Sequence, residues 1–410
     1  MENTLTSLFE LSQLENVSAD YDDKSTFIKG SLRGLSSCPK CGSSHLHRQS
    51  KNHRLLHLPP IGSKPTKLQV STQKQYCVEC KYRWWPKIPF ANGQERMSHS
   101  FVAYALDLLM FGTIKDVSQH LGIGWDVVKK IHKRFLEKKY EIVDVSEVEY
   151  VSIDEFSIAK RHKYMTTIMD IKTGRILYAV EGRKKKDISS SFKDLKKKAP
   201  KLKAIAMDMS KPYRAAAAEY LSGVAVIFDR FHVTQLVNKS VDKVRRKQQA
   251  CLGEEGKNTL KGNRFLFLSN YDNLDDSKKN RLNLALEVNE PLFIMHIMKE
   301  QLRLLWTKPT RKKARKFLGT WIMDAIEAAY NYKNRTGSEV LMPLRKLSMS
   351  LMAHMTGILN YFDYRITNGR MEGTNNKIKT LKRQAYGFRD KVYFRLRLLH
   401  LHEQKAQLTG

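Results

Sequence analysis

The chain has 410 residues, and its 73 lysines and arginines against 41 aspartates and glutamates give a formal net charge of +32 at pH 7. It has no run of 18 apolar residues, and its acidic N-terminus lacks the basic-then-apolar order of a secretory signal, so we expect neither a membrane span nor export. The charge excess favours a polyanionic partner, because lysines and arginines on phosphates release counterions from nucleic acid. Ribosome-like partners would also fit the charge, and a generally basic soluble protein is the alternative, so the charge alone does not name DNA.

Six segments of different composition and periodicity follow one another, which predicts a multidomain α/β protein. In chain order we expect a polar leader, a small zinc-binding domain, a helix-turn-helix, the first part of a mixed-sheet domain, a helical insertion and the second part of the sheet domain. Their boundaries lie at residues 1–35, 36–92, 97–140, 149–254, 255–360 and 361–400.

Four of the five cysteines form two C-x2-C pairs in the second segment, namely Cys38 with Cys41 and Cys77 with Cys80. Each pair presents two thiolates from one turn, and two such turns complete a tetrahedral zinc site. Because all four ligand positions are filled, we expect the zinc to be structural. The long separation between the pairs predicts a β-hairpin excursion between them. Four unrelated cysteines are the competing interpretation.

The third segment predicts three short helices, over residues 101–110, 113–123 and 125–138. Thr113 is expected to cap the second helix, and Gly122 and Gly124 supply the turn before the third. A helix, a glycine-bearing turn and a basic helix are typical of a helix-turn-helix that reads DNA; a plain helical hairpin is the alternative. The residues expected to face DNA are Lys129, Lys130, His132, Lys133 and Arg134.

From residue 149 the hydrophobic period changes to that of strands. A tight hairpin turn is expected over 172–175, and the three-strand meander followed by alternating helices and strands predicts a mixed sheet. The predicted strands are 150–158, 164–172, 175–182, 202–210 and 224–229, and the predicted helices are 187–198, 212–221 and 232–252.

Acidic residues within these strands carry the sharpest chemical prediction. Asp154 lies in the first strand and Asp208 closes the fourth, where a buried carboxylate is costly unless it is paired or binds a cation. In an α/β sheet that begins with a meander, the first and fourth strands commonly lie side by side, so we expect the two carboxylates to converge at one edge of the sheet. Glu372, which opens the last basic helix, is the expected third ligand. Oxygen ligands favour Mg²⁺, or Mn²⁺ in its place.

Further polar residues accompany this triad. Asp229 and His232 form a D-x-x-H pair after the fifth strand, as a supporting pair; Asp229 is also the rival second ligand, whereas Glu155 and Asp170 are weaker rivals. The helix from Gly369 towards Phe388 presents a polar, basic face suited to a phosphate backbone, although a solvated helix face is the alternative. That face comprises Asn375, Asn376, Lys379, Lys382 and Arg383.

Four motifs together resemble the ISL3 family of bacterial insertion-sequence DDE transposases. They are IDEF (153–156), DMSKPY (208–213), DRFHV (229–233) and TNGRMEGTNNKIKTLKRQAYGFR (367–389). The resemblance covers about residues 36–400. It implies an N-terminal zinc-binding domain, a helix-turn-helix and an RNase-H-like catalytic domain whose triad is Asp154, Asp208 and Glu372, with a helical insertion between the last two. It also implies that the Asp229–His232 pair lies near the active site.

We therefore expect a transposase that binds terminal inverted repeats, hydrolyses the element's end and joins the freed 3′-hydroxyl to target DNA, without a covalent protein–DNA intermediate. Two ends must be brought together, so a homodimer on double-stranded DNA is expected, in the bacterial cytoplasm at the nucleoid. The alternatives are a non-catalytic zinc and helix-turn-helix regulator, and an RNase-H-like nuclease selective for DNA structure.

Overall fold

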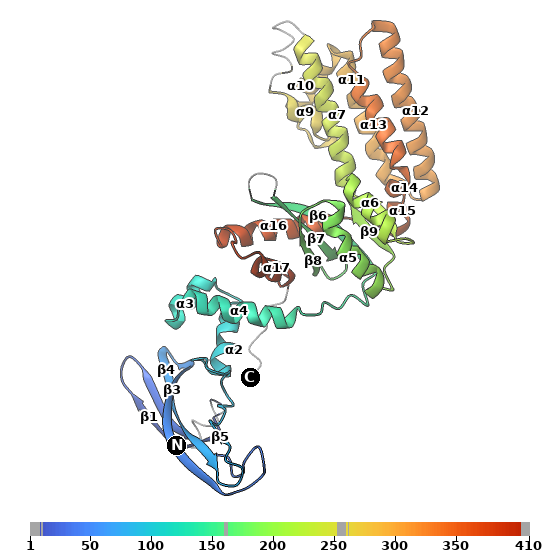
Figure 1. Ribbon diagram of the computed structural model, residues 1–410. Helices are drawn as coiled ribbons and strands as arrows, with labels where there is room; N and C mark the ends of the chain where they lie inside the picture. The colour runs from blue at the N-terminus through green and yellow to red at the C-terminus, as the bar shows by residue number, and fades with distance from the viewer. Residues whose placement is uncertain (1–8, 10, 160–162, 252–259, 261, 403–410) are drawn as a thin grey trace. The chain divides into compact units, whose positions relative to one another are not determined.

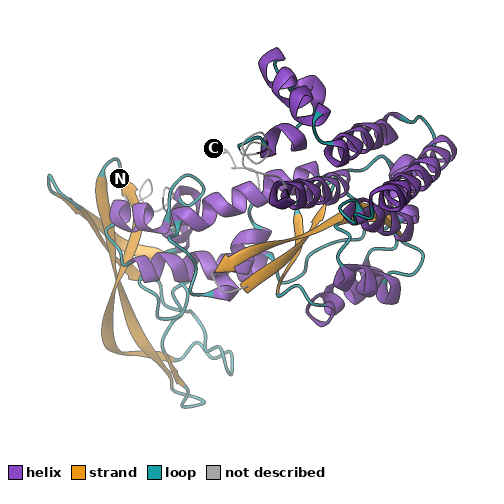
Figure 2. Cartoon of the chain, turned by 90° about the horizontal axis from the view of Figure 1, so that it is seen from above, coloured by secondary structure: helices purple, strands orange, loops and turns teal. Residues whose placement is uncertain are grey.

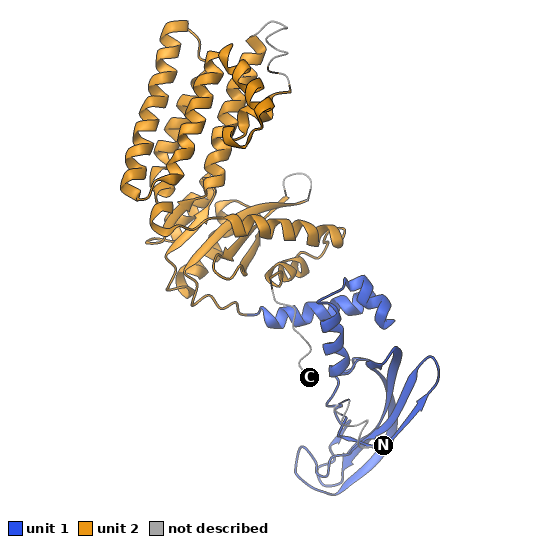
Figure 3. Ribbon diagram, turned by 180° about the vertical axis from the view of Figure 1, so that it is seen from behind, with its two compact units in different colours: residues 1–141, 404–410 blue, residues 142–403 orange. Residues whose placement is uncertain are grey.

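The computed structural model describes residues 9, 11–159, 163–251, 260 and 262–402. The chain divides after Glu141 into two compact units, which are coloured separately in Figure 3. The first residues of the predicted leader and the start of the predicted insertion lie outside the described residues.

The first unit is built on a twisted sheet in the order β1-β2-β4-β3, with β5 paired to β4. Strands β2 and β4 are parallel and the other pairs are antiparallel. Alternating apolar side chains, among them Ile28, Leu56 and Leu68, form its core. The strands are β1 (Leu14–Tyr21), β2 (Thr26–Leu32), β3 (Leu46–Ile61), β4 (Lys64–Cys77) and β5 (Arg83–Trp84).

The predicted leader needs correction, because residues 14–32 supply two strands of this sheet rather than a polar extension. The register of β1 shifts between Glu15 and Ser18, and Asn16 there has a left-handed backbone with φ 54°. Such a bulge breaks the two-residue alternation that identifies a strand in a sequence. Leu14 and Val17 are buried on either side of it.

The β-hairpin predicted between the cysteine pairs is confirmed. Strands β3 and β4 are paired from Leu46 and Cys77 at one end to Ile61 and Lys64 at the other. Gly62 at the tip has φ 60°, a conformation that glycine adopts without steric cost. The hairpin thereby brings the two halves of the cysteine set to its open end.

Three helices complete the first unit, as predicted: α2 (His99–Leu108), α3 (Ile114–Leu121) and α4 (Trp125–Lys139). Thr113 and Asp116 form a reciprocal capping box at the start of α3, and Gly122 ends it with φ 63°. Phe101, Val117 and Val128 from the three helices meet in one small core.

The second unit contains a five-stranded mixed sheet in the order β10-β9-β6-β7-β8. Strands β6, β9 and β10 are parallel to one another, and β7 and β8 continue from β6 as an antiparallel meander. Helices cover the sheet in layers (Figure 2). The strands are β6 (Tyr150–Ala159), β7 (Lys163–Asp170), β8 (Ile176–Glu181), β9 (Ala204–Met207) and β10 (Ala225–Phe228).

The two faces of this sheet differ in their partners. Ile153 and Met207 pack in one core with Phe192 of α5 and Tyr213 of α6. On the opposite face, the ring of Phe156 meets Phe394 of α17 edge to face, with 6.2 Å between ring centroids. The helices are α5 (Lys185–Lys198) and α6 (Lys211–Tyr220) on the first face, and α16 (Gly369–Gln384) and α17 (Lys391–Leu399) on the second.

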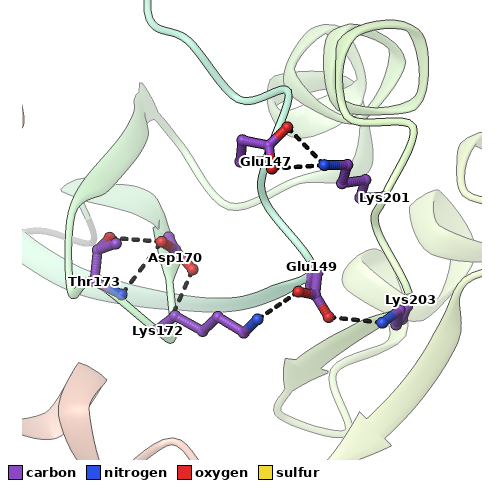
Figure 4. Close-up of polar contacts among 7 residues, drawn as sticks. All are labelled: Glu147, Glu149, Asp170, Lys172, Thr173, Lys201 and Lys203. Carbon is purple, nitrogen blue, oxygen red and sulfur yellow. Dashed lines mark hydrogen bonds and ion pairs between the residues drawn. The ribbon is translucent and has the colours of Figure 1, made fainter.

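The turn between β7 and β8 is closed by Asp170, which is 6% exposed. Its carboxylate accepts hydrogen bonds from the backbone N–H groups of Lys172 (3.0 Å) and Thr173 (3.2 Å), as Figure 4 shows. Gly174 has φ 82° and completes the turn. Asp170 is thus a hairpin residue, and its role in the turn explains why an acidic side chain is buried there.

Ion pairs join the entry of β6 to its two neighbours (Figure 4). Glu149 lies between Lys203, at 2.7 Å, and Lys172, and the hydrogen bonds from Lys172 and then Lys203 lower the pKa of its carboxyl to about 2. Glu147 pairs with Lys201 at 2.6 Å. Because these pairs are solvent-exposed, they fix register more than they add stability.

The helical insertion packs onto the sheet domain, because its apolar side chains form one continuous core with the sheet. Helix α7 starts beside the sheet and runs up into the bundle, where it packs against α11 and α13 (Figure 1). The elements are α7 (Arg230–Cys251), α9 (Arg264–Leu268), η1 (Tyr271–Asn273), α10 (Asp276–Glu287), α11 (Glu290–Arg303), η2 (Leu304–Thr307), α12 (Arg311–Thr336), α13 (Met342–Ala353), α14 (Met355–Leu359) and α15 (Tyr361–Tyr364).

The insertion touches the sheet where α14 crosses β10. A Cβ atom on Gly357 would lie 2.4 Å from Cε2 of Phe228, and the side-chain amide of Asn360 donates to the Val226 carbonyl oxygen at 2.8 Å. We expect Gly357→Ala to lower the free energy of unfolding by about 1–3 kcal/mol, since the Phe228 ring must move. Urea unfolding measures this.

Gly319→Ala in α12 is the matched control, because nothing lies within 4 Å of its added Cβ. That substitution should stabilise the helix by up to about 1 kcal/mol. Equal effects of the two substitutions would contradict the close contact at Phe228.

Candidate active site and metal centre

The four predicted zinc ligands come together at the open end of the β3–β4 hairpin. The Sγ atoms of Cys38 and Cys80 are 3.6 Å apart, as are those of Cys41 and Cys77, and all four lie within 4.8 Å of one another. A tetrahedral site with Zn–S bonds of about 2.3 Å requires S···S distances near 3.8 Å. The backbone N–H of Cys80, followed by the Cys41 thiol, lowers the pKa of the Cys77 thiol to about 7. The set is therefore consistent with a structural zinc ion.

Three aspartates stand in a row where the parallel strands of the second sheet end. Strands β6 and β9 pair Ser152 with Ala206, and β10 and β9 pair Phe228 with Met207. Extending these registers places Asp154 opposite Asp208, and Asp229 opposite Asp208 on its other side. Paired residues of parallel strands share a face, so the three carboxylates lie on the face that carries α16.

Asp154 is the most enclosed member of this row. Burial raises the pKa of its carboxyl to about 6, against the opposing effects of the Glu155 backbone N–H and the charge on His232. The side-chain amide of Asn375 in α16 donates to its Oδ2 at 2.7 Å. The Oδ1 atom of Asn375 is itself buried and has no hydrogen-bond partner among the described residues. An acceptor oxygen without a donor thus lies beside a carboxylate.

Asp229 joins three segments of the chain. It precedes α7, and the backbone N–H groups of His232 and Val233 donate to its carbonyl oxygen at 3.1 and 3.2 Å. Burial raises the pKa of its carboxyl, while the His232 charge and the Asn368 backbone N–H oppose that rise. Since Asn368 caps α16, Asp229 links the start of α7 to the start of α16.

Asp208 and Glu372 differ from Asp154 in their surroundings. Asp208 is half-buried, and its Oδ1 accepts from the Ser210 backbone N–H at 2.5 Å, at the start of α6. Glu372 is exposed in the first turn of α16. It lies three residues before Asn375, a rise of about 4.5 Å along one side of the helix.

The carboxylates of Asp154, Asp208 and Glu372 do not converge closely enough to share one metal ion in this structure. Among the described residues, the four cysteines form a group of metal-ligating side chains whose ligand atoms all lie within 4.8 Å of one another, and the three carboxylates do not. The fold thus brings the two strands and the helix together and leaves the three side chains apart. Glu155 is on the opposite face, where Tyr213 donates to its carboxylate at 3.0 Å.

Comparison with known proteins decides the family. A family model of DDE transposases of the ISL3 type matches residues 151–398, and a model described as the zinc-finger of transposase IS204/IS1001/IS1096/IS1165 matches residues 35–80. The chain belongs to the ISL3 family of DDE transposases. Its N-terminal cysteine set is that family's zinc ribbon.

Relatives of this transposase span most of its length. The transposase for insertion sequence element IS1001 of Bordetella parapertussis is 27% identical over 365 residues, covering 88% of this chain and 87% of the relative. The transposase for IS1557 of Mycobacterium tuberculosis strain H37Rv is 23% identical over 349 residues, covering 79% and 76%. The solved Drosophila P element transposase strand transfer complex gives a TM-score of 0.36 and 11% identity, covering 76% of this chain and 94% of that chain.

The residues predicted to contact DNA through helix α4 of the transposase lie in different environments. Lys130 is exposed, and Lys129 and Lys133 are half-buried. His132, by contrast, is buried at 3% exposure, and Arg134 forms a two-pronged ion pair with Glu95 at 2.5 and 2.9 Å. Of the predicted residues, the structure thus leaves Lys130 exposed and buries His132.

Helix α16 of the transposase is similarly divided. Met371, Thr374 and Ile378 are buried against the sheet. Lys382 donates to the Ser157 carbonyl oxygen at 2.6 Å, and Asn375 faces Asp154. The remaining predicted members of the basic face are exposed, namely Asn376, Lys379 and Arg383.

Two residues near the site were absent from the sequence prediction. The backbone N–H of Asn368 opposes the rise that burial causes in the pKa of Asp229, and the buried Oδ1 of Asn368 has no hydrogen-bond partner in the described part of the chain. Arg370 donates to the carbonyl oxygen of Ile171 at 3.0 Å and so fixes α16 against the β7–β8 turn. Both precede Glu372 by less than two helical turns, and this closeness in the sequence is the feature that could have indicated their place near the site.

Of the helices within the described ranges, none has the length and apolar character that a membrane crossing requires.

Proposed function

We propose that this transposase cuts DNA at the terminal inverted repeats of an insertion sequence and transfers the freed strand, with Asp154, Asp208 and Glu372 as its catalytic carboxylates. The observation that supports the proposal is the parallel register of β6 and β9, which ends two residues before Asp154 and Asp208, together with the hydrogen bond from Asn375 of the helix bearing Glu372 to Asp154. The sheet order, with three parallel strands and an antiparallel meander, supports an RNase-H-like catalytic fold.

The donor atoms at this edge suit a hard divalent cation. Asp154 and Asp208 supply carboxylate oxygens from adjacent strands, and Asn375 adds an unpartnered amide oxygen. Mg²⁺ prefers oxygen ligands, and Mn²⁺ shares that preference. When bound, such ions lower the pKa of an attacking water or hydroxyl and stabilise the leaving oxygen.

The chain's own residues hold this arrangement. Asn375 orients the Asp154 carboxylate, and Asp229 ties the N-terminus of α16 to the end of β10. Glu372, one turn before Asn375, reaches the same edge by rotation of its side chain. We place Asp229 and His232 in support rather than as ligands, since backbone N–H groups already occupy Asp229.

For recognition we propose that the zinc ribbon and α4 bind the inverted repeats through Lys129, Lys130 and Lys133. His132 and Arg134 are left out of this surface, because one is buried and the other is paired with Glu95. Asn376, Lys379 and Arg383 follow phosphates beside the catalytic edge. Synapsis of two ends calls for two copies of the chain on DNA.

The test is nicking of a labelled duplex that carries the repeat bracketing the gene, with and without Mg²⁺. Asp208→Asn and Glu372→Gln should each lower the cleavage rate at least about a hundredfold, as expected for several kcal/mol of lost charge stabilisation. Repeat binding should stay within a few-fold of that of the unsubstituted protein.

Glu155→Gln is the matched control, because this acid neighbours Asp154 in sequence and lies on the other face. Its cleavage rate should be nearly unchanged. Repeat binding without any nicking in Mg²⁺ would favour the regulator instead, and nicking that ignores the repeat sequence would favour the nuclease.

A further inference from the structure

Helix α16 ends in a Schellman C-cap in which a tyrosine occupies the position that glycine usually takes. The Gly387 N–H donates to the Lys382 carbonyl oxygen at 2.9 Å, and the Tyr386 N–H donates to the Arg383 carbonyl oxygen at 3.0 Å. This pair of hydrogen bonds defines the Schellman C-cap, in which one residue takes a left-handed conformation that glycine usually supplies. Here that residue is Tyr386, with φ 48°.

The fold obtains no packing in return for this strain. Tyr386 is 101% exposed, whereas Phe388, two residues later, stacks on Phe394 with 4.6 Å between ring centroids. One aromatic of this turn therefore closes the turn onto α17, and the other projects into solvent. Backbone strain and an exposed aromatic ring without internal compensation are typical of residues kept for binding.

The position of Tyr386 relative to the catalytic edge follows from the course of α16. Asn375 contacts Asp154 and Lys382 contacts Ser157, so the helix runs along β6 away from Asp154. The nine residues from Asn375 to the end of α16 at Gln384 rise about 14 Å, and the C-cap turn that carries Tyr386 extends slightly beyond that. Bases of one DNA strand are about 3.4 Å apart, so this span corresponds to roughly five nucleotides.

We propose that Tyr386 stacks on an unstacked base about five nucleotides from the phosphate held at Asp154. Aromatic rings stack on every base type, and the exposed Arg383 and Arg389 beside this turn suit the adjoining phosphates. The inference rests on the proposed function and adds a contact that the catalytic carboxylates do not make.

The test compares binding of two duplexes in a buffer without magnesium. One is the fully paired repeat, and the other has mismatches around the fifth nucleotide from the cleavage position, so that unstacking costs less. The unsubstituted protein should prefer the mismatched duplex by roughly tenfold, and a 2-aminopurine base at that position should be quenched on binding.

Substitutions separate the ring from its strained backbone. Tyr386→Phe should keep the preference, and Tyr386→Leu should lose it without changing the slope of log affinity against log salt, since no phosphate contact is removed. Arg383→Ala should lower that slope by about one instead. Tyr386→Gly should lose the preference while raising the thermal midpoint of the protein, so loss of binding cannot be attributed to misfolding.

The outcomes distinguish this inference from the proposed function. If the unsubstituted chain binds neither duplex and nicks no DNA, both are overturned. If it nicks the repeat in Mg²⁺ while Tyr386→Leu keeps the full preference, this inference alone is overturned. Equal losses in Tyr386→Phe and Tyr386→Leu would assign the contact to the hydroxyl group and overturn stacking.

Discussion

Asp154→Asn is expected to abolish strand cleavage and, without magnesium, to make the protein more stable. Burial raises the pKa of Asp154 to about 6, so at neutral pH folding moves an ionised carboxylate from water into surroundings that solvate it poorly. Relative to an ordinary aspartate pKa near 3.9, the raised pKa corresponds to a loss of about 3 kcal/mol in folding stability. An asparagine carries no charge and avoids this loss. In a unit of this size the thermal midpoint should rise by roughly 5–10 °C. Calorimetry in magnesium-free buffer measures it.

The stability gain from Asp154→Asn should depend on pH in a defined direction. A carboxyl whose pKa is raised by folding destabilises the native state as pH rises from about 4 to about 6, and the penalty is constant above that. The gain in stability from Asp154→Asn should therefore be absent at pH 3 and complete at pH 7. Mg²⁺ should reverse the order of stability, since the ion binds the ionised carboxylate of the unsubstituted protein and not the amide.

Asp170→Asn provides the comparison within the same sheet, since Val151 of β6 pairs with Asp170 of β7. The Asp170 carboxylate accepts backbone N–H groups in the turn, so this substitution should lower stability by about 1–2 kcal/mol and leave cleavage intact. Cleavage at the unsubstituted rate by Asp154→Asn would refute the catalytic assignment. A lower midpoint in magnesium-free buffer would refute the desolvation argument.

Removal of zinc is expected to eliminate repeat-specific DNA binding. The loops around the cysteines are held by short backbone hydrogen bonds, such as Cys38 N–H to the Ser43 carbonyl oxygen at 2.8 Å, and have little apolar packing of their own. Zinc supplies about 10–16 kcal/mol in small zinc domains. Cys38→Ser should release the metal, and the preference for the repeat over random DNA should fall roughly a hundredfold or more.

Hydrogen exchange localises this effect. Amides of Cys38 and Gly42 should lose protection, whereas those in the middle of the β3–β4 ladder should keep it, because the apolar core around Leu56 and Leu68 does not include the cysteines. Cys251→Ser is the matched control, since this exposed cysteine lies outside the zinc set. Full repeat preference in a zinc-free protein would contradict a reading role for the ribbon.

The sequence predicted those parts of the fold that depend on spacing and period. The cysteine pairs, the hairpin between them, the capped helix at Thr113 and the five strands of the second sheet all follow local rules. Strand β1 did not, because the bulge at Asn16 removes the alternation. The shared core of sheet and insertion also escaped prediction, since helical period identifies a packed face without naming its partner.

The site shows the same division between local and long-range information. That β9 neighbours β6 was expected from strand order, and the register confirms that neighbourhood. The inward position of His132 was readable, because it lies four residues from both Val128 and Leu136. The bond from Asn375 to Asp154 joins residues 221 positions apart, and no pattern within α16 alone could indicate it.

Helix α7 begins directly after Asp229 and continues for 22 residues into the helical bundle. At 1.5 Å per residue it acts as a stiff lever of about 33 Å with one end at the catalytic edge. It packs against α11 and α13 in the bundle. The same helix therefore has its first residue next to Asp229 and its last turns inside the bundle, so one rigid element spans both parts of the unit.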